Sequence, residues 1–209
     1  MNERLSKLTE LVKGRYDNDD PSHDWLHIGR VIKTCKLLAE DEGADLETLL
    51  PAAYLHDVIN VPKNSPDRLK ASQMAAEEAK GILRHVGYRE EEIEKIAQVI
   101  IEHSYSLGLK PTSIESAILQ DADRLDALGA IGMMRHVTVG TRMGASYYHA
   151  EEPFAKNREL EDRKYSLDHY EVKLFKLLDK MNTPAGQKEA KKRTKFMRSF
   201  LEQLKTEIH

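Results

Sequence analysis

Several features that would assign the chain to a particular class are missing from its sequence. Cys35 is the only cysteine among 209 residues, so an intrachain disulfide and a thiolate metal site are both excluded. Its apolar neighbours indicate that Cys35 is a small buried side chain. No apolar run reaches the roughly 18 residues that a membrane-spanning helix needs, and residues 1–5 do not begin a secretory signal. We therefore expect a cytoplasmic protein with no membrane partner.

The chain also lacks a strong excess of either charge. Its 32 basic and 35 acidic residues leave a formal net charge of -3 at pH 7. A chain so close to balance creates no global field that attracts nucleic acid, and we expect no nucleic-acid partner. An anionic substrate must then be held by a few local cations or by a metal ion.

A sustained alternation of apolar and polar residues, which is typical of a half-buried strand, is absent too. Apolar residues recur at helical spacing instead, and this pattern predicts an all-α protein. The length favours one domain, 1–209, with C-terminal helices within 166–207 that complete a compact bundle. Residues 140–165 are the least regular and form a candidate lid. The expected helices occupy 2–16, the stretch between a Ser22 cap and Gly43, 45–59, 67–85, 90–103, 113–128, 129–143, 166–181 and 183–205.

The most informative feature that is present is the adjacent pair His56 and Asp57. The two residues lie in an apolar stretch, 52–59, that otherwise has the composition of a buried core. Burying an imidazole beside a carboxylate costs several kcal/mol unless something pairs with both. A divalent cation suits both side chains, so the pair predicts a metal site near the end of the third helix.

Two other segments offer further ligands for such a site. His23 and His27 lie four residues apart and would share one face of a helix. Asp121, Asp123 and Asp126 lie together in an apolar helical pattern, where three carboxylates would repel one another without a cation. One histidine and one aspartate from these segments would complete a site with two nitrogen and two oxygen ligands.

This order of residues resembles the HD-domain superfamily of metal-dependent phosphohydrolases. The resemblance covers about residues 23–126 and assigns His27 as the first ligand, His56 and Asp57 as the pair that names the family, and Asp123 as the last ligand. Residues 55–68 look closer still to a bacterial subgroup of small stand-alone HD phosphohydrolases that act on nucleotides. The family therefore implies a helical HD bundle and a nucleotide substrate.

Such a ligand set suits one borderline divalent ion. Two imidazoles and two carboxylates favour Mn, Fe, Co, Ni or Zn, and Mg is less favoured because it prefers oxygen ligands. An ion of this kind lowers the pKa of a bound water and polarises a phosphoryl oxygen, which supports hydrolysis of a phosphoester or a phosphoanhydride.

A few further residues are candidates for contact with the substrate. Lys63, Asn64 and Arg68 follow the His–Asp pair in a loop that Pro62 and Pro66 stiffen, and they would bind phosphate oxygens. The alternative is that Lys63 and Arg68 are solvated loop charges.

Five further residues are candidates for proton transfer, for substrate binding or for support of the ligands. His103 follows an apolar run, and related HD proteins place a histidine in this region near the phosphate; otherwise it is a hydrogen-bonded core residue. Asp24 could orient a ligand or hold the attacking water. His23 could bind substrate, or it is simply a residue at the start of a helix. Asp126 could pair with Arg124 or orient a ligating histidine, and Asp121 could do the same.

We interpret the chain as a metal-dependent phosphohydrolase of small nucleotides, and cleavage of a nucleoside triphosphate to the monophosphate and pyrophosphate is the preferred reaction. A nucleotidase and a cyclic or second-messenger phosphodiesterase fit the same resemblance. Two other classes stay open, namely a regulatory nucleotide-binding module without turnover and a two-metal oxygenase that also uses His23 and His103. A homodimer through the helix that carries Met133 and Met134 is a further hypothesis.

Overall fold

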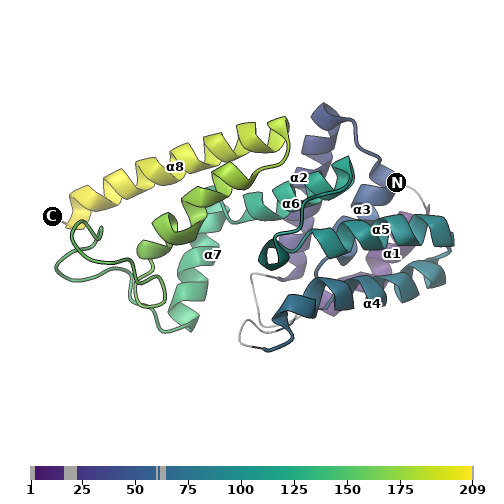
Figure 1. The fold of residues 1–209 in the computed structure, drawn as a ribbon, viewed down its shortest axis with the longest axis horizontal. Helices are drawn as coiled ribbons and strands as arrows, with labels where there is room; N and C mark the ends of the chain where they lie inside the picture. Colours follow the sequence, from purple (N-terminus) through teal and green to yellow (C-terminus); the bar gives the residue numbers. More distant parts are fainter. Residues whose placement is uncertain (1–2, 17–22, 60, 62–64, 209) are drawn as a thin grey trace. The chain divides into compact units, whose positions relative to one another are not determined.

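The computed structural model describes residues 3–16, 23–59, 61 and 65–208, and within them the chain is helical (Figure 1). The described residues form no strand and only one isolated bridge, between Ser146 and Tyr165. The prediction of an all-α protein is therefore confirmed. Its helices include none that is both long and apolar enough to cross a membrane in the part of the chain that is described. The chain divides into two compact units, Met1–Asp123 and Arg124–His209, so one domain for the whole chain stays a prediction.

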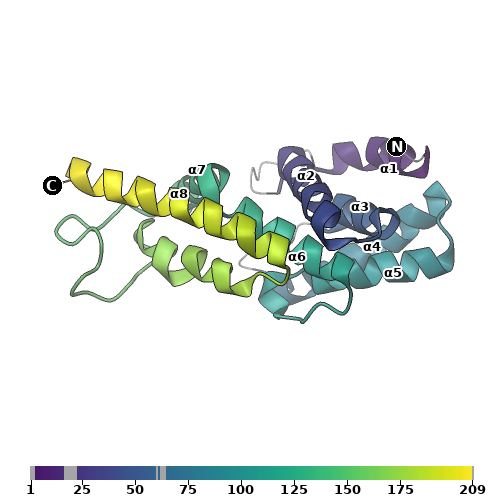
Figure 2. The same cartoon turned by 90° about the horizontal axis from the view of Figure 1, so that it is seen from above.

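The first unit is a bundle in which α4 and α5 run side by side in both Figure 1 and Figure 2. Helix α3 packs against α2 and α5 and is buried from Leu49 to Leu55. A helix that is apolar on all sides is typical of the centre of a bundle, so its end reaches the interior of the unit. The helices of this unit are α1 (Glu3–Lys13), α2 (Trp25–Glu42), α3 (Leu46–Leu55), α4 (Ala71–Val86), α5 (Glu90–Glu102) and α6 (Ile114–Asp126), which crosses the boundary to the second unit.

Helix α2 begins two residues later than the sequence predicts. Its N-cap is Asp24, whose Oδ1 accepts a hydrogen bond of 2.8 Å from the backbone N–H of His27. The prediction of a Ser22 cap is wrong, because aspartate caps as well as serine does and lies directly before the first helical turn; Ser22 itself lies outside the described residues. Gly43 ends the helix as expected, with φ at 74° in the left-handed region that favours glycine.

The cap of α3 provides a first test of the fold. Asp45 accepts hydrogen bonds from the backbone N–H of Glu47 and from the hydroxyl of Thr48. We expect Asp45→Ala to lower the free energy of unfolding by about 1 kcal/mol, because the first turn loses its acceptor. Urea denaturation followed by circular dichroism measures the change. Asp41→Ala, at an exposed position that caps no helix, is the control, and equal losses in both variants would contradict the capping role.

The second unit has two long helices, α7 (Gly129–Arg142) and α8 (Pro184–Ile208). The expected α-helix at 166–181 is a π-helical turn, Tyr170–Leu174, followed by a 3-10 helix, Phe175–Lys180. The buried residues of these two turns lie at 170, 174, 175 and 177. This spacing combines a wide π turn with tight 3-10 turns, and its average resembles the period of one α-helix.

Of the stretch 140–165 that the sequence predicts to be irregular, residues 143–165 are so, and residues 140–142 still belong to α7. Arg158 anchors this stretch with two hydrogen bonds of 2.6 and 2.8 Å to the buried carboxylate of Asp168. Its role as a lid stays a prediction.

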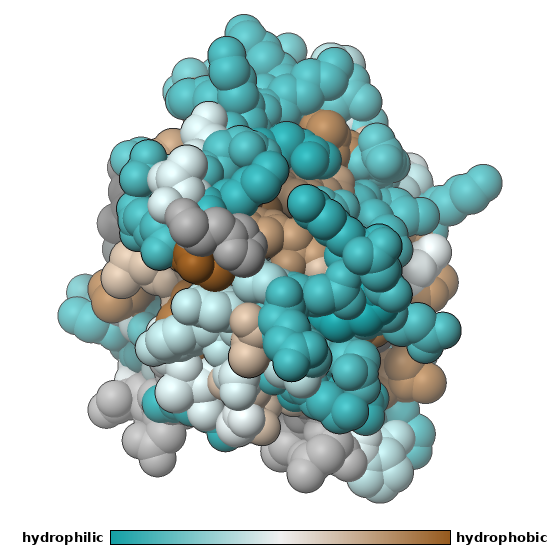
Figure 3. Space-filling model, turned by 90° about the vertical axis from the view of Figure 1, so that its left-hand side faces the viewer, coloured by the Kyte–Doolittle hydropathy of each residue, from teal (hydrophilic) through white to brown (hydrophobic). Residues whose placement is uncertain are grey.

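On the face of the molecule that Figure 3 shows, hydrophilic residues cover most of the surface, and hydrophobic residues gather in a recess near the centre and along the edges. Met134 and Met143 are exposed, and the homodimer also stays a prediction.

His136 of α7 makes the stability of the second unit depend on pH. Its Nε2 donates a hydrogen bond of 2.6 Å to the backbone oxygen of Ser166. Burial, aided by the charge of the neighbouring His169, lowers the pKa of His136 from 6.5 to about 4. Below pH 6.5 the unfolded chain therefore binds a proton that the folded chain does not, so the contribution of His136 to stability is lost as the pH falls from 6.5 to 4.

We expect the difference in unfolding free energy between the wild type and His136→Gln to be constant above pH 7. Below pH 6.5 the wild type should lose stability relative to the variant as the pH falls, by at most about 1.4 kcal/mol per pH unit. Urea titrations at half-unit steps from pH 4 to pH 8 measure it. A difference that is the same at every pH would contradict the assignment.

Candidate metal centre

Four side chains that the sequence predicts as ligands come together at one end of the first unit. His27 lies in the first turn of α2, where the Asp24 cap sets the start of the helix. His56 and Asp57 occupy the turn directly after α3, and Asp123 lies one turn before the end of α6. Three separate segments therefore supply the four side chains.

Their ligand atoms are close enough to share an ion. Nε2 of His27 lies 3.6 Å from Oδ1 of Asp123 and 3.8 Å from Oδ2 of Asp57. Nε2 of His56 lies 3.5 Å from the same Oδ2 of Asp57. Two atoms that each lie about 2.1 Å from one ion are at most about 4.2 Å apart. All three distances satisfy this limit.

The state of His56 fits a metal ligand. The side chain is buried, its Nδ1 donates a hydrogen bond of 2.9 Å to the backbone oxygen of Ala53, and this bond leaves the lone pair on Nε2. Among the described residues, Nε2 of His56 has no hydrogen-bond partner. Burial lowers the pKa of His56 to about 4, so the ring is neutral at pH 7. A buried neutral imidazole with an unused lone pair is a site that a divalent ion would satisfy.

Asp57 is the hub of the cluster. Its Oδ2 lies 2.7 Å from Nδ1 of His23, and its Oδ1 lies 3.7 Å from Nε2 of His103. Burial alone would raise the pKa of Asp57, but the positive charge that His56 gains at low pH, the nearby ring of His103 and the hydrogen bond from His23 outweigh it and hold the pKa well below the usual range. Asp57 is therefore an anion that faces the candidate ligands on one side and His103 on the other.

His103 is the C-cap residue of α5 and is buried beside this carboxylate. Its Nδ1 donates a hydrogen bond of 2.6 Å to the backbone oxygen of Ile100. Burial opposes protonation of the ring, but the neighbouring carboxylate of Asp57 raises its pKa above 6.5. The geometry thus adds His103 and His23 to the neighbourhood of the four candidate ligands.

The structure treats the remaining candidates differently. Asp126 forms a buried ion pair with Arg135, a partner that the sequence analysis did not propose, and Asp121 is fully buried. Lys63 and Asn64 lie outside the described residues. Arg68 begins a short 3-10 helix, Arg68–Lys70, and its side chain lies outside the described part.

Sequence reasoning missed a group of buried polar residues beside His103. Glu102, Ser116 and Gln120 are each 2% exposed or less, and they hydrogen-bond to one another across α5 and α6. A signal was present, because Ser116 and Gln120 lie four residues apart among the apolar positions of α6.

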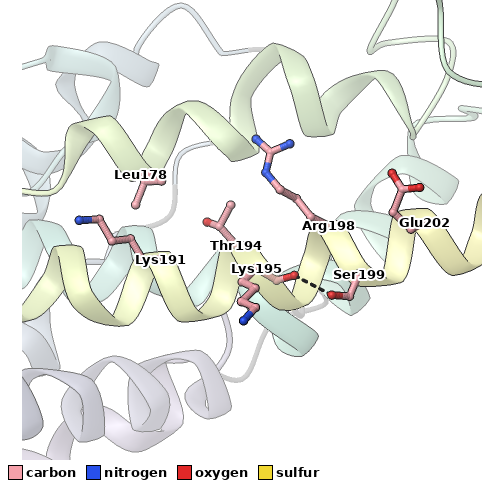
Figure 4. A pocket seen from close by; sticks show the side chains of 7 residues that line it. All are labelled: Leu178, Lys191, Thr194, Lys195, Arg198, Ser199 and Glu202. Carbon is pink, nitrogen blue, oxygen red and sulfur yellow. Dashed lines mark hydrogen bonds between the residues drawn. The ribbon is translucent and has the colours of Figure 1, made fainter.

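A hollow of about 370 Å³ in the second unit has a different character (Figure 4). Three cationic side chains and one carboxylate surround it, together with Thr194 of α8. In the described residues, the groups of histidine and carboxylate that could hold a metal all lie in the first unit, so the chemistry of interest is concentrated there. The lining residues are Leu178, Lys191, Thr194, Lys195, Arg198, Ser199 and Glu202.

Comparison with known proteins identifies the family. The model of the HD domain matches residues 25–128, the segment that carries all four candidate ligands. The chain belongs to the HD-domain family. It is 31% identical to the protein YpgQ of Bacillus subtilis (strain 168) over 209 residues, which cover 98% of this chain and 94% of YpgQ.

Solved HD structures agree with this assignment. The crystal structure of Bacillus subtilis YpgQ in complex with ADP matches with a TM-score of 0.78 at 30% identity and covers 98% of this chain and 94% of that one. An HD-superfamily hydrolase from Bacillus thuringiensis matches with a TM-score of 0.77 at 34% identity, with coverage of 98% and 96%. The prediction of an HD-type helical fold is confirmed, and the relatives support hydrolase activity in general terms.

Proposed function

We propose that this HD protein is a divalent-metal-dependent phosphohydrolase of small nucleotides. In the preferred reaction, water attacks the α-phosphorus of a nucleoside triphosphate, the bond to the bridging oxygen breaks, and pyrophosphate leaves with the electron pair. The observation that carries the proposal is the set of contacts of 3.5–3.8 Å that links His27, His56, Asp57 and Asp123 beside the unused lone pair of the buried His56. The ADP bound by YpgQ supports a nucleotide as the substrate.

The four residues would hold one ion, which could be Mn, Ni, Co, Fe, Zn or Mg. Such an ion, when bound, supplies a water of lowered pKa and polarises a phosphoryl oxygen. Asp57 contributes the negative charge that an ion needs, and its depressed pKa keeps that charge at neutral pH. Asp24 acts through α2, because its carboxylate caps the helix at the backbone N–H of His27 itself. Of the two roles expected for Asp24, the cap favours the one that orients a ligand.

His103 is the proposed proton-transfer residue. With Nδ1 committed to the backbone of Ile100, Nε2 is the atom that faces Asp57 and exchanges a proton. The raised pKa means that this ring carries a proton near neutral pH more often than an ordinary histidine does. A protonated imidazole suits donation to the leaving pyrophosphate.

The remaining negative charge of the substrate needs cationic partners. His23 lies at the rim of the cluster and is only partly buried, so it can face both Asp57 and a phosphate group. Lys63, Asn64 and Arg68 are proposed to complete the phosphate contacts from the loop that follows the His–Asp pair. Residue-by-residue alanine variants would raise KM more than they lower kcat if these contacts only bind the substrate.

A substrate screen tests the proposal. Nucleoside mono-, di- and triphosphates are each incubated with manganese, magnesium, nickel or cobalt, and phosphate and pyrophosphate are measured separately. Pyrophosphate release from triphosphates supports the preferred reaction, whereas phosphate release from monophosphates points to a nucleotidase. Cyclic nucleotides in the same screen report a phosphodiesterase. No release from any nucleotide would contradict a phosphohydrolase and favour a binding module.

A further inference from the structure

Glu102 is a buried carboxylate that the proposed reaction does not use. It is the last residue of α5, it is 2% exposed, and it directly precedes His103. Burying a carboxylate costs several kcal/mol unless hydrogen bonds replace its water. Four donors supply those bonds, and all four are neutral.

The donors come from three places in the sequence. Oε1 of Glu102 accepts hydrogen bonds of 2.6 Å from the amide of Gln98 and 2.7 Å from the hydroxyl of Thr112. Oε2 accepts from the backbone N–H of Thr112, at 2.9 Å, and from the hydroxyl of Ser116. Burial acts against ionisation, but the bonds from Ser116 and Thr112 outweigh it and lower the pKa of Glu102. The carboxylate therefore stays charged and joins the end of α5 to the start of α6.

Gln120 makes a second link between the same two helices. Its buried amide donates to the backbone oxygen of Glu102 at 2.7 Å and to that of Leu109 at 3.0 Å. Asp123, a proposed ligand, follows Gln120 by three residues, and His103 follows Glu102 directly. The two links thus connect the helix that carries His103 to the helix that carries Asp123.

We propose that Glu102 is a positioning residue that holds His103 against the metal centre. The inference rests on the proposed function. An ion held by the four proposed ligands would tie together α2, the turn after α3, and α6, but α5 supplies none of those ligands. His103 is hydrogen-bonded within α5 through Ile100, so its ring moves with that helix. Its distance from Asp57 then depends on the hydrogen bonds of Glu102.

Two variants at this position separate shape from hydrogen bonding. Glu102→Met keeps the approximate volume but leaves all four donors without an acceptor. Glu102→Gln keeps the shape, and its amide can satisfy the same neighbours if the amide of Gln98 turns and the hydroxyl of Thr112 accepts instead of donating. We expect Glu102→Met to lower kcat by roughly 10²-fold, as for a displacement of about 1 Å in a reacting group. Glu102→Gln should recover most of that loss.

The affinity for Mn²⁺, measured by equilibrium titration without nucleotide, is the second readout. We expect it to change by no more than a few-fold in Glu102→Met, because the four proposed ligands lie on other elements. Glu92→Met on the same helix is the matched control. Glu92 forms an ion pair of 3.0 Å with Arg4 and accepts a hydrogen bond from the backbone N–H of Arg89, so its loss should lower stability without changing kcat.

The outcomes are distinct. If Glu102→Met turns over at the wild-type rate, or loses Mn²⁺ binding in proportion to kcat, the positioning role is wrong. If Glu102→Met does not fold, Ser116→Ala removes one of the four donors and must show a smaller loss of kcat at unchanged Mn²⁺ affinity; an unchanged kcat there also overturns the proposal. A wild type that releases nothing from any nucleotide contradicts the proposed function itself, and the positioning role then falls with it.

Discussion

Asp57→Asn is expected to lower the proposed hydrolysis by about 10³-fold or more. Among the described residues, Asp57 is the one carboxylate within 3.8 Å of all four of His23, His27, His56 and His103, so the variant removes the charge at the centre of the cluster. At about 1.36 kcal/mol per factor of ten in rate, this loss corresponds to about 4 kcal/mol of transition-state stabilisation, which a bound ion would supply with the help of the Asp57 charge. Product release at saturating nucleotide and metal measures the effect.

Asn has the same shape as Asp, so the fold should survive the substitution, and circular dichroism checks that it does. Asp179→Asn, at an exposed position of the second unit, is the matched control and should leave the rate unchanged. Mn²⁺ titration of Asp57→Asn should show binding weakened by a similar factor. An active Asp57→Asn variant, or one that binds Mn²⁺ as the wild type does, would show that the ion is held elsewhere.

The fold was largely predictable because each long helix buries one apolar stripe. Helix α5 spans Glu90–Glu102 where the spacing predicts 90–103, and Gly43 ends α2 where expected. The errors have local causes. Helix α3 stops at Leu55, whereas the prediction extends it to residue 59. The prediction runs too far because apolar residues continue into the turn that carries the His–Asp pair. A turn that is packed in the core has the same spacing of apolar residues as a buried helix, so the sequence does not distinguish the two.

The candidate site was predictable only as far as a motif could reach. The four proposed ligands follow a pattern of residue types in a fixed order, and the structure brings them together. The 2.7 Å contact between His23 and Asp57 joins residues 34 positions apart, and no local pattern encodes it. The same holds for Glu102, whose donors depend on how the loop after α5 returns to α6. Hydrogen bonds that join distant segments decide how His103 is placed, and they become visible only in three dimensions.

The effect of His56→Met on the stability of the protein is expected to change sign between the metal-free and the metal-loaded state. Without metal, the wild type buries an Nε2 atom that has no hydrogen-bond partner among the described residues, which costs about 1–3 kcal/mol. Methionine removes that atom at the loss of one hydrogen bond to Ala53, worth about 1 kcal/mol. The metal-free variant should therefore be at least as stable as the metal-free wild type.

With metal present the order should reverse. An ion at 100 times its dissociation constant stabilises the wild type by about 2.7 kcal/mol, which raises the Tm of a chain of this length by about 5–10 °C. His56→Met lacks a proposed ligand and should show almost none of this rise. Thermal unfolding in chelator and in excess Mn²⁺ measures both differences. His85→Met, the same change at an exposed histidine of α4, should keep the full rise. A full rise in His56→Met would exclude His56 as a ligand, because a stabilising ion that does not need this nitrogen is bound by other atoms.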